Sequence, residues 1–471
     1  MSSKSVLIIG AGMGGLTAAI YLARSGYQVK VLEARSTAGG LASGFSMEGL
    51  TFDAGPYVLL DKPGLDWSFS ELGLHTENDL SLRRIESVYE VGSEDGIIRC
   101  FDSEERTSAE METRWHGSGQ RYRRFIKHTG NIYQRLQPLQ RISRPRPWEV
   151  VRHGGWSGVK FLLQSLDNVL KKSGLPEPVK KSLGIWTHVA GQTVRDAPSP
   201  LAFVPSLIHR HGAYFPQGGI GKIPERLFAE ARRLGVEFCF RSEVKTIGTL
   251  RGKITGVETR EGEWISTDII VANAGAVGVY LDLLQNAPAR RKATMRKLPL
   301  QCPGVCIYLA VKGGQYSPYL RFHLPGREEL CRLLILPGVI DPGLQQDGWS
   351  PARLLAPIRH REAEAMGHEG QEQFIQTLLR ETWWREGFTD YRVVATRTPA
   401  QWGEDFHLHQ NSMNPVMTAQ FMRRGRIAHR SPEIKGLYLA GSATHPGQWV
   451  SFCAISGILA ARRIVEDAQC S

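Results

Sequence analysis

Cysteines, metal-binding motifs and long apolar runs are scarce in this chain of 471 residues. None of its seven cysteines belongs to a C-x-x-C pair, which excludes a disulfide framework or zinc ribbon and favours a reducing, cytoplasmic location. No segment approaches the ~18 consecutive apolar residues of a membrane-spanning helix. The chain also lacks an H-E-x-x-H motif and a Ser/His/Asp set with persuasive spacing. We therefore assign no metal and no hydrolytic chemistry.

Positive charge is concentrated in one segment. The chain has 58 Lys and Arg against 46 Asp and Glu, a net charge of +12. Residues 112–181 contain fifteen of the basic residues and only four acidic ones, so this segment carries almost the whole excess. Trp148 and Trp156 lie within it. One helical face is predicted to carry Val159, Leu162, Leu163, Leu166, Val169 and Leu170.

A basic, partly apolar segment of this kind has two interpretations. It can lie peripherally on the cytoplasmic face of an anionic membrane, with its cations among the headgroups and its apolar face below them. Alternatively, its helices pack their apolar faces on their own core and leave the charges in water. The sequence leaves both interpretations open. No nucleic-acid-binding motif accompanies the charge, so no nucleic acid partner is expected.

The N-terminal residues have the pattern of a nucleotide-binding unit. Residues 6–9 form an apolar strand that leads into Gly10-Ala11-Gly12-Met13-Gly14-Gly15, and residues 16–25 follow with helical periodicity. The glycines of this G-x-G-x-x-G turn permit a tight bend, close approach of a pyrophosphate and close helix packing. A second strand at 28–32 ends in Glu33, where a carboxylate can accept hydrogen bonds from a ribose. Together these features predict a dinucleotide site.

Further motifs follow this unit along the chain. They are Gly39-Gly40, Phe52-Asp53-Ala54-Gly55-Pro56, Tyr214-Phe215-Pro216-Gln217-Gly218-Gly219, and the segment 436–447 with Ala440-Gly441 and Pro446-Gly447. In this order the motifs resemble the FAD-binding fingerprint of flavin amine oxidases. They are more closely similar to the fingerprint of phytoene desaturases, carotenoid isomerases and retinol saturases. The resemblance spans nearly the whole chain, with a looser match in the middle third.

The resemblance implies an α/β fold in several discontinuous parts. A Rossmann-like FAD-binding domain is expected from residues 1–85, 214–297 and 426–471. A mixed-sheet substrate domain is expected from 86–111 and 298–425, and the basic helical subdomain from 112–213. Within these parts we expect a hairpin over 87–101, a β meander over 254–273 and a helix near 371–386.

The resemblance also implies FAD as the cofactor. The residues expected to bind it are Gly10, Ala11, Gly12, Met13, Gly14, Gly15, Glu33, Ala34, Arg35, Gly39, Gly40, Leu41, Gly55, Pro56, Tyr57, Val244, Gly441, Ser442 and Val450. His445 and Trp449 are expected beside the flavin as candidate catalytic residues. Three positions depart from the family pattern: Leu41 and Gly275 replace a usual Arg and Asp, and Gln448-Trp449 replaces usual small residues.

The implied activity is oxidoreduction of a hydrophobic isoprenoid or polyene substrate, with C–C desaturation by hydride transfer to flavin N5 as the first choice. Three alternatives stay open: a double-bond isomerase that uses reduced FAD without net redox change, a flavin amine oxidase acting on a soluble amine, and a non-catalytic flavoprotein. The chain shows no second nucleotide-binding unit for NAD(P)H. Quinone or O2 is therefore the expected electron acceptor.

Overall fold

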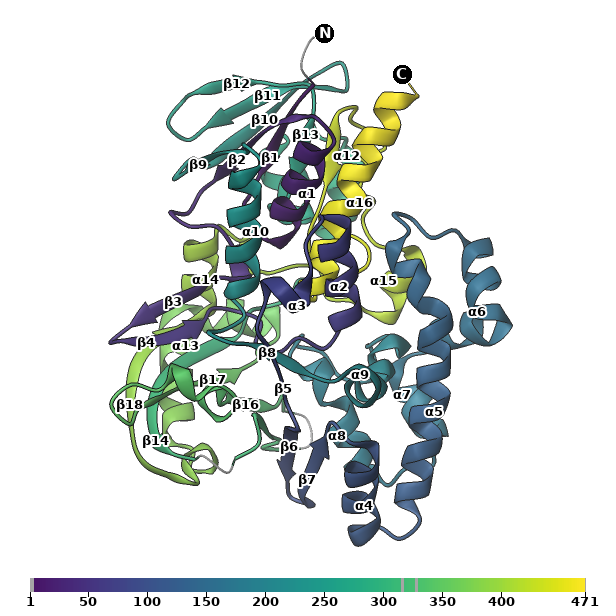
Figure 1. The fold of residues 1–471 in the computed structure, drawn as a ribbon, viewed down its shortest axis with the longest axis vertical. Coiled ribbons are helices and arrows are strands. Elements are labelled where there is room, and N and C mark those ends of the chain that lie inside the picture. Colours follow the sequence, from purple (N-terminus) through teal and green to yellow (C-terminus); the bar gives the residue numbers. More distant parts are fainter. Residues whose placement is uncertain (1–3, 315–316, 327–328, 471) are drawn as a thin grey trace.

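The computed structural model describes residues 4–314, 317–326 and 329–470 (Figure 1). Its first sheet is parallel throughout, with the strand order β19-β13-β1-β2-β9. The strands are β1 (Ser5–Ile9), β2 (Gln28–Glu33), β9 (Glu237–Phe240), β13 (Ile270–Ala272) and β19 (Leu437–Leu439). Because β13 pairs with both β1 and β19, it joins the two ends of the chain in one sheet. This arrangement confirms the Rossmann-like α/β fold class.

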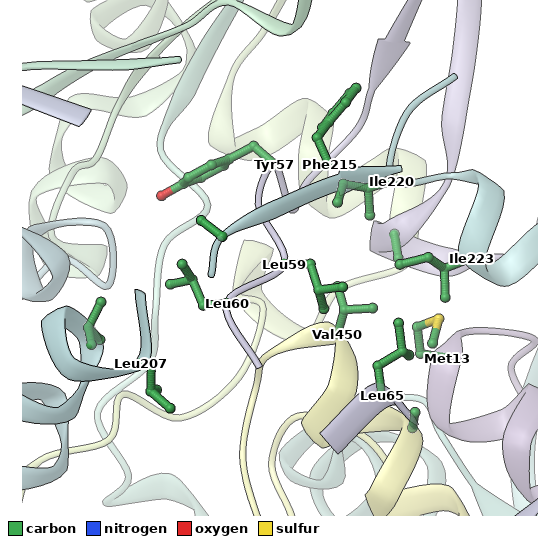
Figure 2. Packing of buried hydrophobic residues seen from close by; sticks show 14 of the residues in the cluster. Met13, Tyr57, Leu59, Leu60, Leu65, Leu207, Phe215, Ile220, Ile223 and Val450 are labelled. Atoms are coloured by element: carbon green, nitrogen blue, oxygen red, sulfur yellow. The ribbon is translucent and has the colours of Figure 1, made fainter. Parts of the chain in front are cut away.

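Helices pack on this parallel sheet or on one another beside it. They are α1 (Met13–Arg24), α2 (Lys62–Glu71), α3 (Thr76–Asp79), α10 (Lys222–Arg233) and α16 (Val450–Gln469). Figure 1 shows α1 and α16 side by side, and a Cβ atom added at Gly457 would lie 2.0 Å from the carbonyl oxygen of Gly14. The two helices therefore pack backbone against backbone. Figure 2 shows Met13 of α1, Leu65 of α2 and Val450 of α16, which belong to one buried apolar cluster.

A small antiparallel sheet adjoins the parallel one. It consists of β10 (Val244–Leu250), β11 (Lys253–Thr259) and β12 (Trp264–Ser266). The meander predicted over 254–273 is wrong at its last strand, because β13 leaves the antiparallel sheet and pairs in parallel with β1. All three residues of β13 are apolar and buried. A short strand buried on both faces fits the interior of a parallel sheet.

The second large sheet is mixed and has the order β18-β14-β17-β16-β15-β6-β7. Its strands are β6 (Ser87–Ser93), β7 (Gly96–Phe101), β14 (Val305–Gly313), β15 (Leu320–His323), β16 (Arg332–Ile335), β17 (Ser350–Ala356) and β18 (Phe388–Arg397). The hairpin expected over 87–101 is confirmed. The helix near 371–386 is α13 (His360–Arg380), which begins earlier and bends at Gly367, where φ is 60°.

Residues 104–211 contain the helices of the basic segment. They are α4 (Glu104–Arg114), α5 (Ser118–Leu136), α6 (Pro147–Leu162), α7 (Leu166–Lys172), α8 (Glu177–His188) and α9 (Val204–His211). The single apolar face predicted across 159–170 is wrong, because Ser165 accepts a hydrogen bond from the backbone N–H of Asn168 and starts a new helix. Leu166 and Leu170 are buried, whereas Leu163 is 52% exposed. None of the helices in the described ranges is long and apolar enough to cross a bilayer.

Shorter elements connect these layers. Two antiparallel strand pairs belong to neither large sheet. In one, β3 (Gly44–Met47) pairs with β4 (Leu50–Asp53), and in the other, β5 (Leu82–Arg84) pairs with β8 (Tyr214–Pro216). Short α-helices are α11 (Ala276–Gly278), α12 (Ala289–Arg296), α14 (Pro399–Phe406) and α15 (Ala419–Arg424). Single turns are η1 (Gly40–Ala42), η2 (Gln137–Arg141), η3 (Ser199–Phe203), η4 (Val279–Leu283), η5 (Pro337–Val339), η6 (Pro342–Leu344), η7 (Trp383–Arg385) and η8 (His409–Asn411). The predicted domain limits stay a prediction.

Candidate functional site

A large cavity of about 2220 Å³ begins at the carboxyl ends of the parallel strands. Nearly all the residues predicted to bind the cofactor line it. They are Gly10, Gly12, Met13, Gly14, Glu33, Ala34, Arg35, Gly39, Gly40, Leu41, Gly55, Pro56, Tyr57, Val244, Gly441, Ser442 and Val450. His445 and Trp449 line the same cavity, whereas Ala11 and Gly15 do not. Segments far apart in the sequence therefore converge as the motifs predicted.

The glycine turn leaves its backbone accessible to a ligand. Gly12 precedes the first turn of α1, and no side chain caps the amides of that turn. A Cβ atom at Gly12 would lie 2.8 Å from Asn273 Nδ2, and one at Gly14 would lie 2.6 Å from Asn273 Oδ1. At Gly15 a Cβ atom would lie 2.0 Å from the carbonyl oxygen of Gly10. Gly12 and Gly14 thus keep the cradle free, while Gly15 lets α1 pack against the turn, which suits a dinucleotide pyrophosphate.

Glu33 is fixed at the end of β2. Its side chain is buried, and its Oε2 accepts a hydrogen bond of 2.7 Å from the backbone N–H of Ala11. Its Oε1 accepts one of 2.9 Å from the backbone N–H of Arg35. Each carboxylate oxygen has a further lone pair that can accept from a ribose hydroxyl. Ala11, although outside the cavity wall, therefore orients the predicted ribose-binding group. The glycine cradle and this carboxylate together fit FAD.

The segment Asp53–Tyr57 forms a second wall of the cavity. A Cβ atom at Gly55 would lie 2.6 Å from the carbonyl oxygen of Leu41, so only glycine permits this approach to the Gly39–Leu41 turn. Asp53 Oδ1 accepts a hydrogen bond of 3.2 Å from the backbone N–H of Gly221. Burial raises the pKa of Asp53 to about 6. The side chain of Asp53 thus braces the segment instead of pointing a free carboxylate at a ligand.

The C-terminal motif closes the cradle from the opposite side. The backbone N–H of Gly441 donates to Ser456 Oγ over 2.9 Å, and Thr444 Oγ1 donates to the carbonyl oxygen of Gly441 over 2.8 Å. These bonds fix the turn between β19 and α16. The first turn of α16 has no side-chain cap, so its amides and Val450 face the cavity. Such a helix start favours negative charge on a bound ligand.

His445 is held by the helical segment. Its Nε2 donates a hydrogen bond of 2.8 Å to the carbonyl oxygen of Leu139. Burial lowers the pKa of His445 to about 3, so the ring is neutral near pH 7. Trp449 stacks on Phe452 with ring centroids 4.9 Å apart and an interplanar angle of 11°. The structure therefore gives both residues defined positions, and their catalytic roles stay predictions.

Three cavity-lining residues were missed by the sequence analysis. Asn273 follows β13 and reaches the glycine turn, while Arg353 on β17 lies beside the Asp53–Tyr57 segment. Asp61 is 1% exposed and accepts hydrogen bonds from Ser451 Oγ at 2.9 Å and from other donors. Burial raises the pKa of Asp61. Their positions depend on strand order and on contacts between distant segments, and no local motif marks them.

The outer rim of the cavity is basic and apolar. Trp148, Trp156 and Leu163 line the cavity and are 53%, 72% and 52% exposed. The arginines of the same rim are Arg141, Arg144, Arg146, Arg423 and Arg424. No ion pair between described residues involves any of these five arginines. In the described ranges, no group of three or more His, Cys, Asp or Glu is placed to hold a metal ion.

Comparisons with known proteins match the whole chain. Two relatives in sequence are the 4,4'-diapolycopene oxygenase of Methylomonas sp. (24% identical, 99% of each chain covered) and the lycopene-forming phytoene desaturase of Pseudescherichia vulneris (25% identical, 99% of this chain and 100% of the relative). An oxidoreductase from Methanosarcina mazei has a similar fold, with a TM-score of 0.67 and 16% identity over 98% of this chain and all of that one. Putrescine oxidase bound to putrescine gives a TM-score of 0.65 and 16% identity over 100% of this chain and 99% of that one.

A family model also covers most of the chain. Residues 13–309 match the model described as flavin containing amine oxidoreductase. The match begins at Met13, within the glycine turn, and includes Glu33 and the Asp53–Tyr57 segment, which line or brace the cavity described above. The chain therefore belongs to the flavin-containing amine oxidoreductase family and is an oxidoreductase with FAD as its cofactor.

Proposed function

We propose that this oxidoreductase removes hydrogen from a hydrophobic isoprenoid or polyene substrate and forms a new C=C bond. The observation that carries the proposal is the continuity of the cavity, which extends from the glycine cradle to the exposed Trp148 and Trp156 of α6 and to Leu163 at its end. Its walls between these ends are largely apolar and include Leu139, Val189, Leu201, Phe203, Leu207 and Met417. A long apolar chain fits such a passage. The names of the two sequence relatives, both carotenoid enzymes, support this substrate class.

Bound FAD supplies the two-electron acceptor for hydrogen taken from a C–H bond. The protein's own contribution is to orient the substrate and exclude water, since an apolar substrate offers few groups for polar catalysts. His445 remains neutral, and its Nε2–H is already donated to Leu139, so its ring contributes a fixed polar edge and no charge. Trp449, stacked on Phe452, narrows the passage where small residues are usual. These residues would set which part of the chain-like substrate lies at the flavin.

Desaturation is preferred over the alternatives for specific reasons. A soluble amine is a cation near pH 7 and would be repelled by the arginines of the rim, whereas the exposed indole and leucine side chains there suit an apolar substrate. A double-bond isomerase would share the cavity but leave the mass of the product unchanged. We propose quinone or O2 as the electron acceptor, because a lipid-soluble quinone can enter by the same apolar rim.

The rim of the cavity also supports peripheral membrane contact, and we propose that it docks on anionic lipid headgroups at the cytoplasmic face. Trp156 and Leu163 provide exposed apolar groups, and the rim arginines provide positive charge that no ion pair between described residues engages. Interfacial binding needs this combination of cations and apolar side chains. The cavity would then receive its apolar substrate directly from the bilayer.

The experiment that tests the activity is anaerobic bleaching of the bound flavin. The holoprotein is mixed with detergent-dispersed phytoene, with related polyenes and, separately, with soluble amines. We expect polyenes to bleach the visible absorbance of the oxidised flavin, with a product lighter by two hydrogens. A product of unchanged mass would establish isomerisation instead. Bleaching by amines alone would refute the proposed substrate class.

A further inference from the structure

Arg353 connects the mixed sheet to the cavity wall. It lies on β17, is 5% exposed and lines the cavity. Its Nη1 donates hydrogen bonds of 2.7 and 2.8 Å to the carbonyl oxygens of Asp53 and Ala54, and its Nη2 donates one of 2.6 Å to that of Gly55. One guanidinium thus binds three consecutive carbonyls, which only the forked geometry of arginine permits.

Two tyrosines of the same sheet region bind the same segment. Tyr308 of β14 donates its hydroxyl to the carbonyl oxygen of Ala54 over 3.3 Å. Tyr319, immediately before β15, donates its hydroxyl to the carbonyl oxygen of Tyr57. Both tyrosines are buried. The segment Asp53–Tyr57 therefore takes its backbone position from side chains of the mixed sheet, although its residues Gly55, Pro56 and Tyr57 face the cofactor cavity.

The charge of Arg353 is not neutralised by a salt bridge. Within the described ranges no carboxylate forms an ion pair with its guanidinium. The carboxylate of Asp53 interacts electrostatically with Arg353 and offsets part of its charge, while its Oδ1 accepts a hydrogen bond from the backbone N–H of Gly221. The guanidinium also lies over the Tyr57 ring, 5.7 Å from its centroid. A buried cation held mainly by carbonyl dipoles exerts its positive field on its surroundings, here the wall of the cavity.

We propose that Arg353 is a positioning residue for the flavin: it fixes the Asp53–Tyr57 segment against the cofactor, and its charge favours the electron-rich reduced state. The mixed sheet thereby sets the position of a cofactor wall. This role depends on the FAD assignment and on no particular substrate, so the tests below are independent of the proposed activity.

A purely structural role for Arg353 is separated from positioning by a matched control. Arg332 lies on the neighbouring strand β16, is 7% exposed and binds the carbonyl oxygen of Leu330 together with Glu329 and Glu381. It does not line the cavity. Arg332→Met therefore removes a buried arginine from the same sheet without touching the cofactor wall.

The experiment measures FAD affinity and the midpoint potential of the bound flavin for Arg353→Met, Arg353→Lys and Arg332→Met. For Arg353→Met we expect the FAD dissociation constant to rise at least about tenfold, because three buried hydrogen bonds are lost. We also expect a more negative midpoint potential, because the reduced flavin loses a nearby positive charge. Arg353→Lys keeps the charge but cannot bind three carbonyls, so its potential should stay near that of the parent while its affinity falls. Arg332→Met should change neither quantity, even where it lowers the melting temperature.

Two outcomes would overturn the proposal. One is a folded Arg353→Met protein with parental FAD affinity and potential. The other is an equal change of both quantities in Arg332→Met, which would show a general effect of sheet stability. If Arg353→Met does not fold, Arg353→Lys and Tyr308→Phe decide the matter. Unchanged FAD affinity in both of those variants would also refute the role.

Discussion

The backbone N–H of Ala11 donates a hydrogen bond of 2.7 Å to Glu33 Oε2 and so links the glycine turn to the end of β2. The carboxylate that is predicted to bind the ribose is thereby oriented by the same turn that is predicted to accommodate the pyrophosphate. A change at either residue should disturb both parts of the dinucleotide site.

Replacing Glu33 should weaken FAD binding in proportion to the acceptors lost. Hydrogen bonds to a charged group are worth about 1.5–3 kcal/mol, so Glu33→Ala should raise the FAD dissociation constant roughly 10- to 100-fold. Glu33→Gln keeps one acceptor oxygen and should have a smaller effect. Flavin fluorescence titration measures both. The control is Glu237→Gln on the adjacent strand β9, whose exposed carboxylate pairs with Lys30; an equal loss there would contradict the assignment.

A side chain at Gly12 should block the cradle. The Cβ atom of Gly12→Val would approach Asn273 Nδ2 to 2.8 Å, and its methyl groups would extend into the cavity. We expect the variant to be purified colourless and to remain so after incubation with FAD. The control is Gly26→Asn, because Gly26 has a φ of 82° that asparagine tolerates and no atom within 4 Å of an added Cβ. A yellow, fully loaded Gly12→Val protein would place the cofactor elsewhere.

Removing the exposed apolar side chains of the rim should weaken membrane binding. In the Trp156→Ser/Leu163→Ser double variant, lost burial of two large side chains, each worth about 1.5–3 kcal/mol, should reduce binding to phosphatidylglycerol vesicles at least tenfold. Sedimentation with sucrose-loaded vesicles at low and high salt measures the fraction of protein bound to the vesicles. The control, Leu250→Ser, removes a side chain that is 65% exposed on β10 of the antiparallel sheet. If the double variant and Leu250→Ser sediment with vesicles as the parent does, the exposed side chains of the rim do not bind membrane and the basic helices have a structural role only.

Stability should fall on acidification because of buried histidines. Burial lowers the pKa of His429 to about 4 and that of His445 to about 3. Between pH 6.5 and about 4 the unfolded chain therefore binds more protons than the folded one. Their stabilising contribution is complete above pH 6.5 and is lost as the pH falls, at up to about 1.4 kcal/mol per pH unit for each group.

The variant His429→Gln tests this pH dependence. Its unfolding free energy, measured by urea titration from pH 7 to pH 5, should fall less steeply than that of the parent. His116→Gln serves as the control because the His116 side chain is fully exposed. Equal slopes in the parent and His429→Gln would show that His429 is not responsible.

Asp53 should act in the opposite direction. Its pKa is raised to about 6 by burial, so between about pH 4 and 6 the folded state holds its proton more tightly than the unfolded state. Its contribution is complete below pH 4 and is lost as the pH rises through 6. In the parent, this group makes the unfolding free energy decrease between about pH 4 and 6. In Asp53→Asn that decrease should be absent. The effect would be contradicted if the unfolding free energy of Asp53→Asn changed between pH 4.5 and pH 6.5 by as much as that of the parent.

The parts of the site that the sequence analysis identified lie in continuous motifs. The glycine turn, Glu33, the Gly55 segment and the start of α16 each combine a few adjacent residues with a local conformation, so spacing alone is informative. Arg353 and Asn273 could not be identified in this way. Their partners Gly55 and Gly10 lie 298 and 263 residues away in sequence and become neighbours only through the strand order.

The helical segment 159–170 shows a different limit of prediction from the sequence. Apolar periodicity predicted one continuous face, but Ser165 divides α6 from α7 and turns Leu163 outward. Side-chain capping thus overrode a helical pattern that looked uninterrupted. Leu163, one of the exposed apolar side chains of the rim, lies beside this break.

The position of β19 affects when the cofactor can be acquired during synthesis. This strand, Leu437–Leu439, pairs with β13 and leads into Gly441, which closes the cradle opened by β1. A ribosome releases these residues long after the first strand has emerged, and domains fold as units once all their strands are available. Nascent chains of this protein should therefore remain unable to retain flavin until Leu437–Leu439 and Gly441 have emerged from the ribosome.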